Sequence, residues 1–289
     1  GHGVDDFNTG RKHGLPVLCP VDEAGTLTAE AGPFEGLNVL KDANAVIITA
    51  LEDSGSLLLQ ENYSHRYPYD WRTKKPTIFR ATEQWFASVE GFRTEALTAI
   101  DGVQWLPASG RNRIESMVSE RGDWCISRQL WWGHRIPAYY LPNGEYVVAK
   151  TAEEALAQAN AQFGTQYSLT DLRQDEDVLD TWFSSWLWPI SVFDTEVFTT
   201  GKPNKELSYY YPTNDLVTAP EILFFWVARM IIAGYEYLGE KPFKNVYLTG
   251  IVRDKLGRKM SKSLGNSPDP LELIAQYGAD GVRTGMLFS

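Results

Sequence analysis

The sequence predicts an α/β fold that contains the second half of a doubly wound parallel sheet, and three consecutive stretches carry this prediction. A β-like run at 215–218 precedes a long apolar helix that ends near Gly239, and another β run follows at 245–252. A strand, a buried helix and a strand in this order form a parallel crossover. The last strand leads directly into a Lys-rich loop at 257–266. Doubly wound sheets bind ligands at the carboxyl ends of their strands, so we expect the site at this loop.

Length and composition are those of a globular protein with one large or two ordinary domains. The chain has 289 residues, of which 43% are hydrophobic and 22% are charged, which is enough to build a core. A net charge of -10 argues against a protein that coats nucleic acid over its whole surface. It does not exclude RNA, because a local basic face on an acidic protein is sufficient for binding.

Cysteine usage and hydropathy indicate the compartment. Cys19 and Cys125 are far apart and have no neighbouring Cys, which fits a reducing cytosol and offers no zinc-binding spacing. No apolar run reaches the roughly 18 residues that a membrane span requires. We therefore expect a cytoplasmic protein with no membrane segment and no zinc.

The amino-terminal stretch, which ends at Pro76, has the pattern of short strands and turns. We predict strands at 15–20 and 38–40, and a helix at 43–53 that Asp42 caps. An aromatic and basic segment bounded by prolines comes before residue 77, and we place the domain boundary at its end.

Helices and strands alternate after this boundary. Apolar spacing predicts a helix at 111–120, and a small module is inserted at about 139–177. The other predicted elements are a strand at 77–80, a hairpin around Asn143-Gly144, a helix from the capping box of Thr151 to about Phe163, a strand at 207–211, and a last helix that Ser267 caps and Gly278 ends.

The Lys-rich loop carries side chains suited to a phosphate ligand. Lys259 and Lys262 supply positive charge, and Ser261 supplies a hydroxyl donor. Gly257 and Gly265 provide hinges on either side. Such a loop can stabilise a polyphosphate whose charge rises during a reaction. The alternative interpretation is a basic surface loop, and a Lys-rich pentamer alone does not exclude it.

Sequence blocks in this loop and along the chain carry a resemblance to a known family. Lys259-Met-Ser-Lys-Ser263 resembles the signature loop of class I aminoacyl-tRNA synthetases. Tyr247-Leu-Thr-Gly-Ile-Val-Arg-Asp254 before it and Asp269-Pro270 after it match the same class. Four further blocks resemble the valyl/isoleucyl subgroup and occur in the family's order: Gly1-His-Gly-Val-Asp-Asp6, Asp123-Trp-Cys-Ile-Ser-Arg-Gln129, Asp180-Thr-Trp-Phe-Ser-Ser185 and Glu221-Ile-Leu-Phe-Phe-Trp-Val-Ala-Arg-Met230. Together they span almost the whole chain.

The resemblance implies a role for residues around the predicted sheet. Trp182, Ile222 and Trp226 would wall the pocket for the amino-acid side chain. Rigid aromatic walls suit an aliphatic substrate, because one methylene changes binding by only about 1 to 3 kcal/mol. The family's ATP would be bound, with Mg²⁺, by Glu221, Gly250 and Met260, and Lys259, Lys262 and Ser261 would stabilise the departing pyrophosphate. Each of the apolar residues could instead belong to an ordinary core.

Residues 1–76 resemble the carboxyl-terminal part of the family's inserted editing domain. Asp6 matches the carboxylate that holds the α-ammonium of a mischarged amino acid, although a surface Asp in a turn would look the same. Asp70 and Thr73 stand where isoleucyl enzymes often carry a Cys pair, which again predicts no zinc.

The family's other signature, a His-x-Gly-His run, is absent, so we expect a fragment that cannot form aminoacyl-adenylate alone. The resemblance assigns 77–289 to the second half of the Rossmann-type catalytic domain. The parent would be a monomer that activates valine, or else isoleucine, with ATP and transfers it to tRNA(Val) or tRNA(Ile). Three alternatives stay open: a catalytically incomplete tRNA-binding or regulatory relative, a stand-alone aminoacyl-tRNA deacylase, and another nucleotidyl transferase on the same fold.

The resemblance changes along the chain. The first 125 residues or so are isoleucyl-like, and the remainder is valyl-like. The change falls near Asp123 to Gln129, a run that both subgroups share. An early-branching relative and a composite of two synthetases both predict this pattern.

Overall fold

A computed structural model describes residues 3–70, 73–261 and 264–288. The contacts between Cα atoms divide the chain into two units, Gly1–Glu83 and Gln84–Ser289. The division falls shortly after Pro76, where the sequence predicts a boundary.

The first unit consists of short helices joined by loops. Its elements are α1 (Val4–Lys12), the 3-10 helix η1 (Ala29–Phe34) and α2 (Ala43–Asp53). The predicted bounds of α2 are confirmed, but the Asp42 side chain does not cap the helix, because its Oδ1 accepts a hydrogen bond from the amide of Asn38. The predicted strands are wrong: 15–20 and 77–80 form none, and 38–40 contributes only an isolated bridge between Asn38 and Thr26.

Little apolar surface is buried in this first unit. Ala43 is the buried residue of α2, whereas Leu15, Leu18 and Leu58 are exposed. An apolar run predicts a buried strand only when a partner surface covers it, and here none of the described residues does so.

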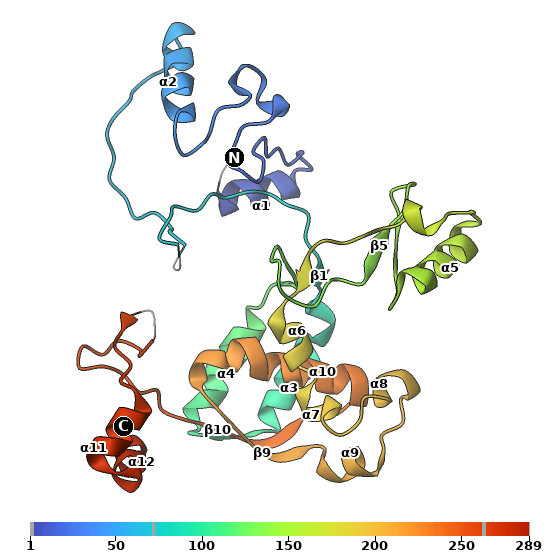
Figure 1. The fold of residues 1–289 in the computed structure, drawn as a ribbon, viewed down its shortest axis with the longest axis vertical. Coiled ribbons are helices and arrows are strands. Elements are labelled where there is room, and N and C mark those ends of the chain that lie inside the picture. The colour runs from blue at the N-terminus through green and yellow to red at the C-terminus, as the bar shows by residue number, and fades with distance from the viewer. Residues whose placement is uncertain (1–2, 71–72, 262–263, 289) are drawn as a thin grey trace. The chain divides into compact units, whose positions relative to one another are not determined.

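The second unit is organised around a parallel sheet of three strands, β2 (Gln104–Leu106), β10 (Phe243–Leu248) and β9 (Thr213–Thr218), in that spatial order. Both pairings of β10 are parallel. The predicted α/β class with a parallel crossover is therefore confirmed, and the strands predicted at 215–218 and 245–252 correspond to β9 and β10 (Figure 1).

Three helices, α3 (Arg93–Asp101), α4 (Ser109–Ser119) and α10 (Ala228–Leu238), cover one face of this sheet. The core between them is a single apolar cluster that includes Ile100, Trp105, Ile114, Leu216, Met230, Ile231, Phe243 and Val246. Helix α4 matches the helix predicted at 111–120.

The opposite face of the sheet carries apolar side chains that the described residues leave partly exposed. Tyr247 on β10 lies between Leu106 on β2 and Val217 on β9, because the register pairs it with both. These side chains are 53%, 40% and 62% exposed, respectively. A parallel sheet is normally covered on both faces, so this apolar row is unusual.

The segment between β9 and β10 is helical but not one continuous α-helix. A 3-10 turn, η4 (Pro220–Ile222), is followed by a π-helical turn, η5 (Leu223–Val227), and only then by α10, which ends at Leu238 with Gly239 as its C-cap. A π-turn changes which side chains share a face and often occurs at functional sites. Ile222 and Trp226 are four positions apart, but they lie in η4 and η5 and so do not share a face as they would in one continuous α-helix.

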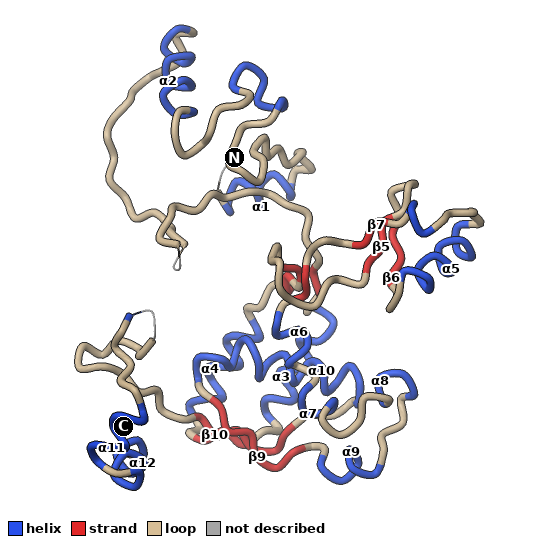
Figure 2. The backbone as a smooth tube through the Cα atoms, viewed as in Figure 1, coloured by secondary structure: helices blue, strands red, loops and turns tan. Residues whose placement is uncertain are grey.

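A small antiparallel sheet of β6 (Tyr146–Val148), β5 (Ala138–Tyr140) and β7 (Arg173–Gln174) occupies the predicted inserted module (Figure 2). Helix α5 (Ala152–Phe163) packs on it, and the two share an apolar cluster of their own. The predicted start of α5 is confirmed, because Thr151 Oγ1 accepts a hydrogen bond from the amide of Glu154.

Shorter elements connect the module to the parallel sheet and extend the unit beyond it. They are η2 (Glu90–Phe92), the pair β1 (Phe86–Ala87) and β3 (Trp124–Cys125), the pair β4 (Ser127–Arg128) and β8 (Val178–Leu179), η3 (Leu169–Asp171), and the helices α6 (Thr181–Ser185), α7 (Trp188–Ser191), α8 (Val197–Thr200) and α9 (Lys205–Tyr210). The strand predicted at 207–211 is wrong, since Asn204 caps α9 there and Leu207 is buried.

Two helices, α11 (Pro270–Tyr277) and α12 (Ala279–Leu287), follow the Lys-rich loop. The cap of α11 is Asp269, two positions after the predicted Ser267, and its Oδ1 accepts a hydrogen bond from the amide of Leu271. Across the described ranges, the structure has no helix that is both long and apolar enough to cross a membrane.

Candidate functional site

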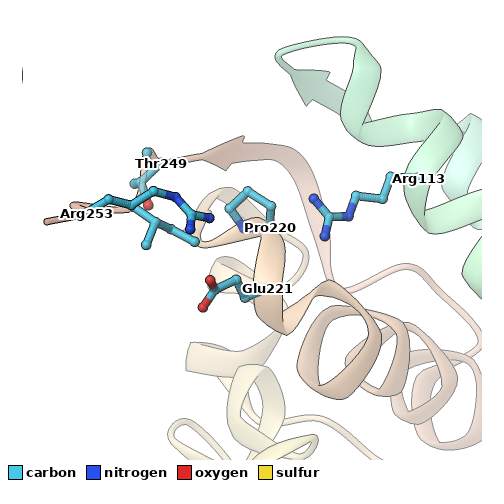
Figure 3. A pocket seen from close by; sticks show the side chains of 7 residues that line it. Arg113, Pro220, Glu221, Thr249 and Arg253 are labelled. Carbon is cyan, nitrogen blue, oxygen red and sulfur yellow. The ribbon is translucent and has the colours of Figure 1, made fainter. Parts of the chain in front are cut away.

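A cavity of about 290 Å³ lies at the carboxyl ends of β9 and β10. Its lining residues are Arg113, Pro220, Glu221, Thr249, Gly250, Ile251 and Arg253. Figure 3 shows Arg113 reaching toward the opening from α4 and Arg253 from the segment after β10, with Pro220 between them. The position agrees with the expectation that a parallel sheet binds its ligand at this edge.

Glu221 and Lys259 connect the cavity to the Lys-rich loop. The 3-10 turn η4 directs Glu221 to the cavity, and its Oε2 forms an ion pair with Nζ of Lys259. The two residues are 38 positions apart in the chain. The structure thus brings together Glu221, Gly250 and Lys259, three of the predicted site residues.

The loop itself is built on two glycines and a pair of polar side chains. Gly257 and Gly265 have φ values of 72° and 63°, in the left-handed region that favours glycine. Asp254 and Asn266 meet between these turns, where Nδ2 of Asn266 donates a 2.9 Å hydrogen bond to Oδ2 of Asp254. This contact connects the segment before Gly257 with the residue after Gly265.

The hydrogen bonds around Asp254 stabilise its charged form. The bond from Asn266, and those from Arg258 and the amide of Leu256, hold the pKa of the Asp254 carboxyl well below its usual range. A depressed native pKa means that the stabilising contribution is complete above the ordinary Asp pKa of about 3.9 and is lost as pH falls through the native value. The carboxylate is thus ionised at physiological pH.

The other predicted loop residues lie close to these contacts. The amide of Ser261 donates a 2.8 Å hydrogen bond to Oδ1 of Asn266, and Met260 is half-buried beside it. Lys262, the second predicted lysine, lies outside the described residues.

None of the predicted amino-acid pocket residues lines the cavity. Trp182 and Trp226, with Phe225, form an aromatic group where α6 meets η5. Trp182 on α6 stacks on Phe225, with ring centroids 6.0 Å apart, and Nε1 of Trp226 donates a 3.0 Å hydrogen bond to the carbonyl oxygen of Ser185. Helix α6 and the π-turn η5 are therefore linked by two contacts. Ile222 is partly buried and directly follows Glu221 in η4.

A buried carboxylate, Asp180, holds this aromatic group in place. It caps α6 through the amide of Trp182, and its Oδ2 accepts a 2.9 Å hydrogen bond from Nε1 of Trp124. The same oxygen pairs with Arg128 at 3.0 Å and with Arg229 at 3.8 Å. Burial, together with the nearby Arg121, lowers the pKa of Arg229 to about 10, while the Asp180 carboxylate opposes this shift.

Asp6, the predicted editing residue, belongs to the first unit. It is an exposed residue in the first turn of α1, and its Oδ2 accepts a 3.1 Å hydrogen bond from the amide of Gly3. This is a helix-capping contact, so it neither supports nor opposes an editing role.

Sequence reasoning did not single out Arg113, Asp254 or Asn266. Nothing in the linear spacing relates α4 to the loop, so Arg113 had no local signal. The Asp254 and Asn266 pair did have a local signal, since a lone Asp in a basic stretch and an Asn after Gly265 are both residues that stabilise turns.

Among the residues that the structure describes, no group of three or more His, Cys, Asp or Glu could hold a metal ion.

A comparison with protein families finds one match that covers most of the chain. Residues 35–289 match the family described as tRNA synthetases class I (I, L, M and V).

Curated relatives match nearly the whole chain. The isoleucine–tRNA ligase of Synechococcus is 55% identical over 98% of this chain, and the valine–tRNA ligase of Bacteroides fragilis is 54% identical over 100% of it. These matches cover 31% and 33% of the two relatives, so the chain spans about a third of their length. Neither match is confined to one side of Asp123 to Gln129.

A solved structure has a similar fold. The methionyl-tRNA synthetase of Mycobacterium tuberculosis, bound by methionyl-adenylate, superposes with a TM-score of 0.51 at 19% identity. The superposition covers 76% of this chain and 36% of that one.

Proposed function

We propose a function from one premise: the chain belongs to the class I tRNA synthetases of the isoleucine, leucine, methionine and valine group. The parent protein would be an ATP-dependent aminoacyl-tRNA ligase. Residues 77–289, with the insertion at about 139–177, would supply the second half of its catalytic domain, and residues 1–76 the carboxyl-terminal part of its editing domain. The carboxylate of the amino acid attacks the α-phosphorus of ATP in this reaction, which forms the adenylate and releases pyrophosphate.

The observation that carries this proposal is the ion pair of Lys259 with Glu221 at the cavity. It places a loop cation beside a carboxylate that can accept hydrogen bonds from the ribose hydroxyls of ATP. Gly250 lines the same cavity and has no side chain to obstruct the nucleoside. Lys259, with Lys262 and Ser261, would then balance the charge that builds on pyrophosphate, and Mg²⁺ would enter with ATP.

We propose valine as the amino acid, with Trp182, Ile222 and Trp226 as walls of its pocket. The alignment to the valine–tRNA ligase has 291 positions, nearly the length of this chain. The alignment to the isoleucine–tRNA ligase has 312 positions although it covers 98% of this chain, so it contains more gaps. This difference supports valine. The contacts of Trp182 with Phe225 and of Trp226 with Ser185 support a rigid aromatic wall.

The remaining parts of the proposal concern the whole parent. It would transfer valine to tRNA(Val), or isoleucine to tRNA(Ile), as a cytoplasmic monomer, and Asp6 would hold the α-ammonium of a mischarged amino acid during editing. The printed names of the curated relatives support the tRNA and amino-acid partners.

The test is the exchange of labelled pyrophosphate into ATP by the full-length protein, measured with valine and with isoleucine. Lys259→Ala should lower the exchange rate by about 100-fold, the scale of losing one preorganised charge contact, and we expect a similar loss for Lys262→Ala. Lys255→Ala is the matched control, since Lys255 is exposed in the same segment and has no hydrogen bond or ion pair with the residues that the structure describes.

Two outcomes would contradict the proposal in different ways. An unchanged rate for Lys259→Ala would remove that lysine from the mechanism. A full-length protein that exchanges no pyrophosphate with either amino acid would leave the RNA-binding relative, the deacylase and another nucleotidyl transferase on the same fold.

A further inference from the structure

We infer that Asp254 and Asn266 are positioning residues that clasp the two ends of the Lys-rich loop and thereby hold Lys259 at the cavity. This inference rests on the proposed function for its catalytic consequence, but not for its structural part. We call the pair, with its hydrogen bonds, the loop clasp.

The Asp254 carboxylate forms one side of the clasp. Its Oδ1 accepts hydrogen bonds from the amides of Leu256 and Arg258, both at 2.9 Å. Its Oδ2 accepts bonds from Nε of Arg258 at 2.8 Å and from Nδ2 of Asn266 at 2.9 Å. The side chain is only 12% exposed. Four donors therefore converge on one largely buried carboxylate, and two of them are loop amides.

Asn266 forms the other side by using both ends of its amide. Its Oδ1 accepts the hydrogen bond of the Ser261 amide at 2.8 Å, while its Nδ2 donates to Asp254 and, at 3.3 Å, to the carbonyl oxygen of Lys259. A carboxylate at 266 could accept the first bond but could donate neither of the others. The position therefore requires an amide.

The clasp acts on Lys259 through the backbone. Asn266 holds the Lys259 carbonyl, and Arg253 forms an isolated antiparallel bridge with Lys259. The Lys259 side chain is then free to extend to Glu221. Backbone contacts thus fix the position of the Lys259 main chain, and the ion pair with Glu221 fixes the position of its ammonium group.

Apolar packing contributes little to the order of the loop, because most of the loop is exposed. Leu256 is 75% exposed and the Lys259 side chain is 60% exposed. Gly257 and Gly265 permit the turns but add backbone freedom, which favours disorder in the absence of other contacts. The hydrogen bonds of the clasp are therefore the main contacts that order the loop residues which the structure describes.

The structural part is tested by hydrogen exchange on the full-length protein, followed by mass spectrometry of peptides across 253–266. Asp254→Asn keeps the size of the side chain but removes its charge and two acceptor positions. The remaining oxygen can still accept from the amides of Leu256 and Arg258, whereas the bonds from Arg258 Nε and Asn266 Nδ2 are lost. Asn266 is then no longer held, and we expect exchange at the Ser261 amide, which donates to Asn266, to accelerate by about tenfold or more. Asp280→Asn is the control, since Asp280 is an exposed carboxylate on α12 with no partner among the described residues. Equal exchange in the Asp254→Asn protein and the control would overturn the clasp.

The catalytic part is tested by pyrophosphate exchange with the same variants. Asp254→Asn should lower kcat by about tenfold to 100-fold with an unchanged KM for the amino acid, since no hydrogen bond, ion pair or ring contact joins the described loop residues to Trp182 or Trp226. Asn266→Asp should lower kcat as well, because it sets two carboxylates against each other. The double variant Asp254→Asn with Asn266→Asp restores one donor and one acceptor across the clasp and should recover part of the rate.

The structural and catalytic parts of the inference are contradicted by different results. A double variant no faster than the slower single variant, or a loss that appears only in the amino-acid KM, would overturn the positioning role. If the unaltered protein exchanges no pyrophosphate, the proposed function fails, and the hydrogen-exchange result still decides whether the clasp exists.

Discussion

At the scale of single residues, Glu221 has two possible partners. It pairs with Lys259 in this structure, and it lines the cavity in which we propose that ATP binds. An ion pair between side chains that are 31% and 60% exposed contributes only about 0 to 1 kcal/mol to stability. Its importance should therefore lie in ligand binding and not in folding.

We predict that Glu221→Gln in the full-length protein raises the KM for ATP by about tenfold, because the carboxylate is lost from the site while the shape is kept. The unfolding temperature should change by less than about 3 °C. Steady-state kinetics with varied ATP and a thermal melt check both values. A large loss of thermal stability with an unchanged KM would show that Glu221 acts in folding instead.

At the scale of elements, Asp180 joins α6 to the strands behind it and to α10. Arg229 is buried on α10, with its guanidinium 4.0 Å from the centre of the Trp124 ring. A buried cation that loses its carboxylate costs about 3 to 5 kcal/mol, whereas an apolar residue of similar volume in its place is often tolerated.

Asp180→Asn should therefore destabilise the full-length protein by about 3 kcal/mol, and Arg229→Met added to it should restore part of that loss. Urea unfolding of the two proteins measures the difference. Amino-acid specificity should weaken in the single variant, because the residue that caps α6 beside Trp182 loses its ion pairs with Arg128 and Arg229 and is held less firmly. If Arg229→Met adds a further loss to the Asp180→Asn protein, the buried charge is not the cause.

At the scale of the whole molecule, one face of the parallel sheet carries apolar side chains that the described residues leave partly exposed. Leu106, Tyr247 and Val217 form an exposed apolar row on strands of a type that is normally buried on both faces. The curated relatives are about three times as long as this chain, so they contain sequence that could supply a cover. Under the proposed function, the other half of the catalytic domain would cover this face.

Tyr247→Lys should then destabilise the full-length protein by about 3 kcal/mol, as for loss of a buried aromatic side chain. Tyr209→Lys is the matched control, since Tyr209 on α9 is 81% exposed and lies away from the row, and it should change stability by less than about 0.5 kcal/mol. Denaturant unfolding compares the two. Equal, small effects would mean that this face stays open in the parent.

The sequence predicted those features whose cause is local. Thr151 begins α5 because its hydroxyl meets an amide three residues later, and Gly257 and Gly265 turn the loop because they tolerate positive φ. The prediction at 207–211 was wrong because three tyrosines favour a strand, whereas the Asn204 cap and the burial of Leu207 favour a helix. The run at 15–20 was wrong for a related reason: apolar character predicts burial only where a partner surface is present.

By itself, then, the sequence determined the α/β class, the parallel crossover and the loop that carries Lys259, because strand and helix periodicity and glycine placement are properties of neighbouring residues. Only the tertiary structure decided that Glu221 meets Lys259, that Arg113 joins the cavity, and that Asp254 is tied to Asn266. These contacts join segments separated by many residues, and hydrogen bonds and ion pairs form over only a few ångströms. The spacing of residues along the chain does not show which distant residues come within this range, so these contacts are known only from the folded structure.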